Sequence, residues 1–128
     1  MPYVYANARA LDGQPKLDDE ECVALIRRYT SAPHTAAWKQ GIPVMGNKNI
    51  RPGTAIATFE KGRYPARPDH KHAAFYLGQV STGIWVIDQW PGSTKKNISR
   101  RFIERKEIFD DGTCFQPSDN CFAFSVIE

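Results

Sequence analysis

The chain has 128 residues and a formal net charge of +3, from 17 Lys and Arg against 14 Asp and Glu. Its 41% hydrophobic and 24% charged residues fit a folded chain and exclude a disordered one. The length predicts one domain over residues 1–128, and no apolar run approaches the roughly 20 residues of a membrane-spanning helix. We therefore expect no membrane insertion, and the small charge argues against a dedicated nucleic-acid binder.

The first strong pattern predicts a helix over Leu17–Tyr29. Asp18 or Asp19 is suited to cap its N-terminus, and acids in the first turn with arginines in the last turn favour the helix dipole. Cys22 then lies about one turn into the helix. The buried face follows helical spacing and is expected to contain Cys22, Leu25, Ile26 and Tyr29.

Strand patterns follow a short second helix, which is expected over Thr35–Gln40 and ends at Gly41. The expected strands are Thr54–Phe59, Ala73–Leu77, Ile84–Trp90, Ser99–Ile103 and Cys121–Ile127. Ser81-Thr82-Gly83 predicts a tight turn that joins the second and third strands as a hairpin. The predicted fold class is α+β, with an N-terminal helix that carries a cysteine packed on a mainly antiparallel sheet of four to six strands.

Three residues near the ends of these elements have the types that cysteine hydrolases use. Cys22 lies near a helix N-terminus, where the helix dipole favours a thiolate. His72 opens a strand, and Asp88 lies in an apolar segment where a carboxylate is costly without a partner. In the hairpin, His72 and Asp88 lie near the same end, so Asp88 can orient the imidazole and stabilise its cation. The trio indicates thiolate–imidazolium chemistry.

Each of these residues also has a purely structural interpretation. Cys22 fits a small core residue, and the four acids before it disfavour a thiolate. His72 fits a hydrogen-bonded structural group, and Asp88 fits a turn cap. The sequence contains no ligand spacing typical of zinc, so we expect no metal and no other cofactor.

The motifs occur in a recognisable order. After the cysteine helix come PGTAIA at 52–57, HAAFYLG at 72–78 and GIWVID at 83–88. This order resembles the NlpC/P60 and CHAP papain-like peptidases of bacterial cell walls. More narrowly, ECVALI at 21–26, the pair Trp38 and Gly41, GTAIATF at 53–59 and DQW at 88–90 are similar to the small amidase effectors delivered by type VI secretion. The resemblance covers roughly residues 17–104.

The resemblance implies hydrolysis of an amide bond in the peptide stems or cross-links of peptidoglycan, without a metal. It makes Cys22 the nucleophile, His72 the base and Asp88 the orienting group, although the wider superfamily often has His in the third place. It also implies an antibacterial toxin that works with a secretion apparatus and has a cognate immunity protein. Because the first residues lack the basic start and apolar core of a secretory signal, we expect synthesis in the cytoplasm, secretion and action in the target-cell periplasm.

A basic loop between the first two strands is the candidate for binding substrate carboxylates. The expected substrate-binding residues are Arg63, Tyr64 and Arg67 in this loop, with Gln89 and Trp90 at the end of the strand that carries Asp88. A solvated surface loop is the alternative. Cys114 and Cys121 bracket six residues, a spacing that allows a disulfide in an oxidising periplasm, whereas they stay thiols in a reducing cytoplasm.

Three other functions remain open from the sequence. A phage or autolytic CHAP-type wall hydrolase would share the chemistry. A non-catalytic wall-binding module would use the aromatic residues Trp38, Trp85 and Trp90, although such residues are more often core. A nuclease-type toxin would need clustered acids for a metal or a stronger basic face.

Overall fold

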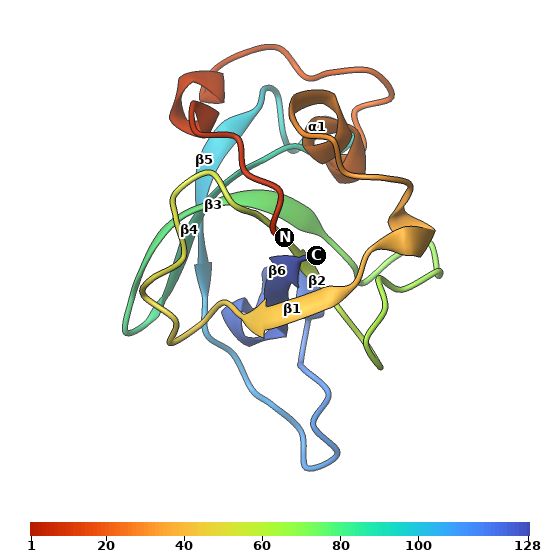
Figure 1. Cartoon of the computed structure of the whole chain (residues 1–128), viewed down its shortest axis with the longest axis vertical. Helices are drawn as coiled ribbons and strands as arrows, with labels where there is room; N and C mark the ends of the chain where they lie inside the picture. Colours follow the sequence, from red (N-terminus) through yellow and green to blue (C-terminus); the bar gives the residue numbers. More distant parts are fainter.

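Six strands form one antiparallel sheet against which the only α-helix packs, in the computed structural model that describes residues 1–128 (Figure 1). The strand order is β1-β6-β2-β3-β4-β5. The elements are α1 Cys22–Tyr29, β1 Gln40–Pro43, β2 Ala55–Thr58, β3 Ala73–Val80, β4 Gly83–Asp88, β5 Ser99–Glu104 and β6 Phe124–Ile127. This arrangement confirms the predicted α+β class.

Helix α1 is shorter than predicted. It begins at Cys22, with Glu21 as N-cap, so the expectation of a start near Leu17 capped by Asp18 or Asp19 is wrong. The reason is local: Asp18 and Glu20 have φ of 55° and 68°, in the left-handed region that a right-handed helix excludes. Cys22 is therefore the first helical residue, where backbone N–H groups lack intrahelical acceptors and the dipole is most positive.

The predicted second helix is also wrong. Only a single 3-10 turn forms, at Thr35–Ala37, and the chain then enters β1. Gly41 does not end a helix; it lets β1 approach β6 closely, because a Cβ there would lie 2.8 Å from the Val126 carbonyl oxygen. The last predicted strand is shortened as well, since Cys121–Ala123 forms a 3-10 turn before β6.

The hairpin of β3 and β4 is present as predicted and sets the geometry of the site. Val80 pairs with Gly83 across the turn, and Phe75 pairs with Ile87. Asp88, the last residue of β4, therefore lies near the beginning of β3, which His72 directly precedes. On its other side, Asp88 pairs with Ser99 of β5.

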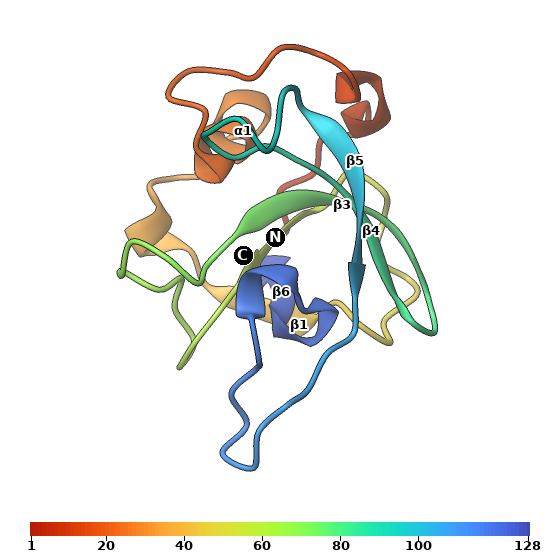
Figure 2. The same cartoon turned by 180° about the vertical axis from the view of Figure 1, so that it is seen from behind.

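The sheet buries apolar side chains on both faces. One cluster lies between the sheet and α1 and includes Leu25, Ile26, Phe75 and Ile87. The other cluster lies on the opposite face and includes Ile56, Tyr76, Val86 and Phe124. Both views show α1 above β3 and the long connection between β5 and β6 projecting from the opposite side of the molecule (Figures 1 and 2). No helix combines the length and apolar character that crossing a membrane requires.

Gly53 gives a test of how the N-terminal segment is fixed to the sheet. It has φ +95°, and a Cβ there would overlap the Tyr5 carbonyl, while Tyr5 N–H donates to the Gly53 oxygen at 2.8 Å. We expect Gly53→Ala to lower the free energy of unfolding by about 2–4 kcal/mol in a urea titration. Gly112→Ala is the control, with φ +88° but nothing within 4 Å, and should cost about 1 kcal/mol. Equal losses would contradict the steric argument.

Candidate active site

The fold brings Cys22, His72 and Asp88 together. His72 Nε2 lies 2.8 Å from Asp88 Oδ2. Cys22 lies close enough to the same imidazole for each of the two groups to shift the pKa of the other. Because Nε2 faces the carboxylate, Nδ1 is the ring nitrogen left for the thiol. The three residues are 8%, 5% and 0% exposed, so their interactions take place largely out of water.

His72 is fixed by its backbone as well as by its ring. Its N–H donates to Thr58 Oγ1 at 3.1 Å, and the Thr58 N–H donates to the His72 carbonyl at 2.9 Å. The imidazole meets the rings of Trp90 and Phe124 edge-on, with centroids 6.1 and 6.4 Å away. These contacts leave the ring one orientation, toward Asp88 on one side and Cys22 on the other.

Two cations that sequence reasoning missed surround Asp88. Lys95 Nζ lies 2.8 Å from Oδ1, and Arg101 Nε lies 2.9 Å from Oδ2. Burial raises the pKa of Asp88, but the hydrogen bond from His72 and the charges of His72, Arg101 and Lys95 outweigh it and hold that pKa well below its usual range. Asp88 is therefore ionised throughout the working pH range.

The alternation of residues along the strands could have predicted one of these two cations, Arg101. Arg101 pairs with Val86 of β4, so their side chains lie on the same face of the sheet. Asp88 comes two residues after Val86 and therefore shares this face. A buried carboxylate demands a partner on that face. Lys95 belongs to the connection between β4 and β5, where no periodicity places a side chain.

The electrostatics favour an ion pair between thiolate and imidazolium. Burial raises the pKa of Cys22, but the hydrogen bond and charge of His72, with help from Tyr64, bring the pKa below its ordinary value. Burial lowers the pKa of His72, but the bonds and charges of Asp88 and Cys22 raise it to about 9. Both shifts favour the charged pair of Cys22 thiolate and His72 imidazolium over the neutral pair.

Tyr64 lies at the thiol rather than on an open surface. Its hydroxyl is 3.7 Å from Cys22 Sγ, and its ring packs on Trp38 with centroids 5.0 Å apart. Burial and the charge of Cys22 raise the pKa of Tyr64 far above its ordinary value. The phenol therefore keeps its proton and can donate it to a thiolate.

The basic loop is less free than expected. Both carboxylate oxygens of Glu60 accept from Arg67, which also donates to the His70 carbonyl at 2.7 Å. Arg67 is thus occupied within the chain, and the expected role in gripping substrate is not available to it in this structure. Arg63 is exposed, and its guanidinium forms no bond within the chain.

The two residues after Asp88, Gln89 and Trp90, differ in their exposure. Gln89 was expected to bind substrate, but it is 0% exposed, and its carboxamide bonds to the backbone of Leu17 and Glu21. That expectation is corrected, because a buried amide with saturated partners does not meet a ligand. Trp90 does face open space. It lines a cavity of about 400 Å³ together with Lys71, His72, Arg101, Ser118 and Asp119.

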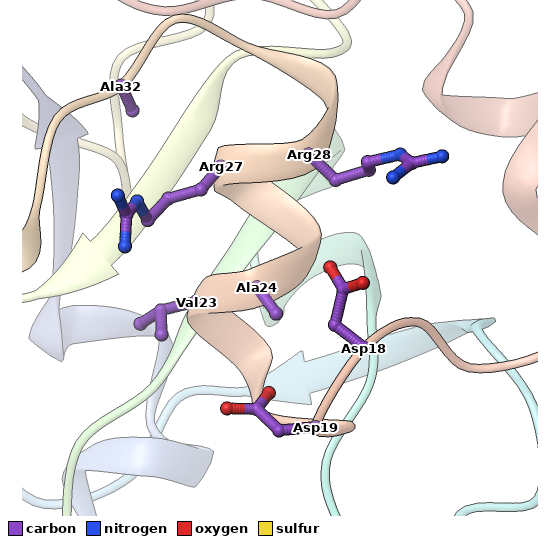
Figure 3. Close-up of a pocket in the computed structure, with 7 residues that line it drawn as sticks. All are labelled: Asp18, Asp19, Val23, Ala24, Arg27, Arg28 and Ala32. Atoms are coloured by element: carbon purple, nitrogen blue, oxygen red, sulfur yellow. The ribbon is translucent and has the colours of Figure 1, made fainter.

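A second cavity, of about 340 Å³, lies on the outer face of α1 (Figure 3). None of the three reactive side chains lines it; its walls are Asp18, Asp19, Val23, Ala24, Arg27, Arg28 and Ala32. No group of three or more His, Cys, Asp or Glu side chains is placed to hold a metal ion.

All three cysteines are free in the structure, which holds Cys114 and Cys121, the possible disulfide pair, as thiols. Cys121 is buried and Cys114 is half-buried. Burial raises the pKa of both thiols, that of Cys121 to about 11. Only Cys22 has the environment of a reactive thiol.

In this α+β scaffold, a cysteine at the start of a helix lies beside a histidine whose imidazole is bonded to a buried carboxylate. This is the arrangement of a papain-like hydrolase. The model of the family "Domesticated amidase effector 2" matches residues 4–116. The chain belongs to this family of amidase effectors.

Individual relatives agree. The type VI secretion amidase effector 2 protein of Salmonella typhi is 45% identical over 133 residues, covering 100% of both chains. Domesticated amidase effector 2 of Ixodes scapularis is 40% identical over 120 residues, 88% of this chain and 73% of that protein. The solved structure of type 6 secretion amidase effector 2 (Tae2) superposes with a TM-score of 0.93 at 44% identity, covering 98% of this chain and 94% of that one.

These findings confirm the predicted resemblance, the fold and the assignment to hydrolytic enzymes. An NlpC/P60-like papain fold is consistent with them.

The reactive thiol can be tested directly. We expect iodoacetamide to alkylate Cys22 rapidly at pH 7, because its thiolate is stabilised by His72, while Cys114 and Cys121 react slowly. Peptide mass spectrometry assigns the label to each cysteine. His72→Ala should shift the pH midpoint of Cys22 alkylation upward. Equal rates at the three cysteines in folded protein would refute the ion pair.

Proposed function

We propose that this protein hydrolyses an amide bond in the peptide stems or cross-links of peptidoglycan. Cys22 acts as nucleophile, His72 as acid and base, and Asp88 as the group that orients His72. The observation that carries the proposal is the contact chain from the Cys22 thiol through the His72 imidazole to Asp88, with the Cys22 pKa lowered and the His72 pKa raised. Membership of an amidase effector family supports the same reaction.

In the first step, the Cys22 thiolate attacks the amide carbonyl carbon and forms a tetrahedral oxyanion. N–H groups in the first turn of α1, including that of Cys22, lack helical acceptors and can donate to this oxygen. Tyr64, which keeps its proton, is a further donor beside the sulfur. The C–N bond then breaks as His72 gives its proton to the leaving amine, which leaves a Cys22 thioester.

In the second step, neutral His72 removes a proton from water, and the resulting hydroxide attacks the thioester. The C–S bond breaks, the acid product leaves and the thiolate–imidazolium pair is restored. Asp88 holds the imidazole in place through both steps. Because Lys95 and Arg101 keep Asp88 ionised, it stabilises the imidazolium without taking its proton.

The cavity beside His72 fits the leaving side of the substrate. His72 protonates the leaving amine, so the residue that carries this amine must lie next to the imidazole. The cavity of about 400 Å³ opens on His72 and not on Cys22. Its Trp90 ring offers an apolar wall, whereas the charges of Arg101 and Asp119 are already paired with each other.

The relatives support a proposal for the biological setting. One is named a type VI secretion amidase effector 2 protein, so we propose delivery by a secretion apparatus and action in the periplasm of a target cell. A producer that makes such an enzyme needs protection, and we propose a cognate immunity protein as its partner. Co-purification from a producing strain would identify that partner.

Digestion of purified muropeptides tests the reaction. We expect the wild-type protein to release smaller peptides from linear or cross-linked muropeptides, and the product masses identify the bond. Cys22→Ala should lower the rate at least 1,000-fold, on the order of losses for removed nucleophiles. Cys114→Ala, a thiol outside the site, should leave it unchanged. Cleavage by Cys22→Ala at the wild-type rate would exclude the proposed nucleophile.

The pH dependence follows from the two coupled groups. The active form needs Cys22 deprotonated, which its lowered pKa allows below the usual thiol range, and it needs His72 protonated, which fails above its pKa of about 9. We expect a bell-shaped profile of kcat/KM with its alkaline limb near pH 9. Asp88→Asn removes the charge that stabilises the imidazolium, so its alkaline limb should move to lower pH. An alkaline limb that does not move in Asp88→Asn would contradict the orienting role.

A further inference from the structure

Gln89 connects the two halves of the site. It directly follows Asp88, and its carboxamide is wholly buried. Its Oε1 accepts from the Leu17 N–H at 3.0 Å, and its Nε2 donates to the Leu17 carbonyl at 3.2 Å and to the Glu21 carbonyl at 2.8 Å. Glu21 is the N-cap of α1, and Cys22 is the next residue.

The segment between these anchor points is strained. Asp18 and Glu20 both have positive φ, which is unfavourable for residues with a side chain. Such a conformation persists only where the surroundings enforce it. Asp19 Oδ1 accepts from the Glu21 N–H at 3.0 Å, but this bond lies inside the segment. Gln89 is the side chain that grips both ends of the segment and ties them to the sheet.

We propose that Gln89 is a positioning residue that holds the Cys22 thiol against the imidazole of His72. Two consecutive residues of one strand end then set both partners of the reaction. Asp88 fixes the ring of His72, and Gln89 fixes the beginning of the helix that carries Cys22. A relaxed segment would let the helix start shift, and a small shift separates the thiolate from the imidazolium.

The test replaces Gln89 with Met, which has similar volume and no charge and removes all three hydrogen bonds. One readout is the pH midpoint of Cys22 alkylation, measured without substrate and assigned by peptide mass spectrometry. We expect this midpoint to rise by about one pH unit, because the thiolate loses its cation. The second readout is cleavage of a muropeptide, where kcat should fall at least tenfold and KM should change less than about twofold.

Gln79→Met is the matched control. The Gln79 carboxamide also ties a loop to the sheet, through bonds to Gly46, Val44 and Asn47, but this loop is not part of the site. This variant should lose thermal stability with no shift of the alkylation midpoint. If Gln89→Met keeps the wild-type midpoint, or if both variants shift it equally, the positioning role is overturned.

If Gln89→Met does not fold, Gln89→Glu provides a second test of the positioning role. Glutamate retains the acceptor for the Leu17 N–H, and its protonated form restores one donor. We therefore expect its kcat, relative to wild type, to recover as the pH falls, and a constant ratio would overturn the proposal. The kcat readout rests on the proposed function, whereas alkylation does not. A wild-type protein that cleaves no muropeptide would refute that function and leave the positioning test intact.

Discussion

The structure depends on one buried charge, the carboxylate of Asp88. A carboxylate fully removed from water is strongly unfavourable unless cations and hydrogen bonds replace its hydration. Here His72, Lys95 and Arg101 supply that replacement, and Asp119 in turn holds Arg101. Because three positive groups converge on one carboxylate, the network carries excess positive charge. A thiolate at Cys22 partly compensates this excess, which links the stability of the network to the reactivity of the site.

The same strand end controls the helix. A helix stabilises a thiolate most when the cysteine is its first residue, because N–H groups without helical acceptors lie nearest to the sulfur there. For α1 to begin at Cys22, the residues before it must have non-helical backbone angles. The positive φ of Asp18 and Glu20 meets this requirement. Strain of this kind needs an external constraint, and Gln89 supplies it from the position directly after β4. Local conformational strain thus has a tertiary cause.

Much of this arrangement could be predicted from the sequence, and the failures have physical reasons. The apolar alternation and the turn at Ser81-Thr82 located the β3–β4 hairpin, and a costly Asp88 in that hairpin pointed to His72. The predicted helix start was wrong because Asp18 and Asp19 are favourable N-cap residues. The backbone conformation of this segment is instead set by the Gln89 carboxamide, which is distant in sequence. Strand alternation gives the direction of the Gln89 side chain but not what covers it, so the sequence does not reveal its bonds to Leu17 and Glu21.

The acids that precede Cys22 illustrate how burial decides which charges count. By sequence alone, four acids next to a thiol argue against a thiolate. In the structure, Glu20 pairs with Lys16, and Asp18 and Asp19 line the cavity on the outer face of α1 to which Arg27 and Arg28 also contribute (Figure 3). Water screens charges on that face, so their effect on the sulfur is small. His72 acts on the same sulfur across a buried contact of low dielectric, so the nearest buried cation outweighs several exposed anions.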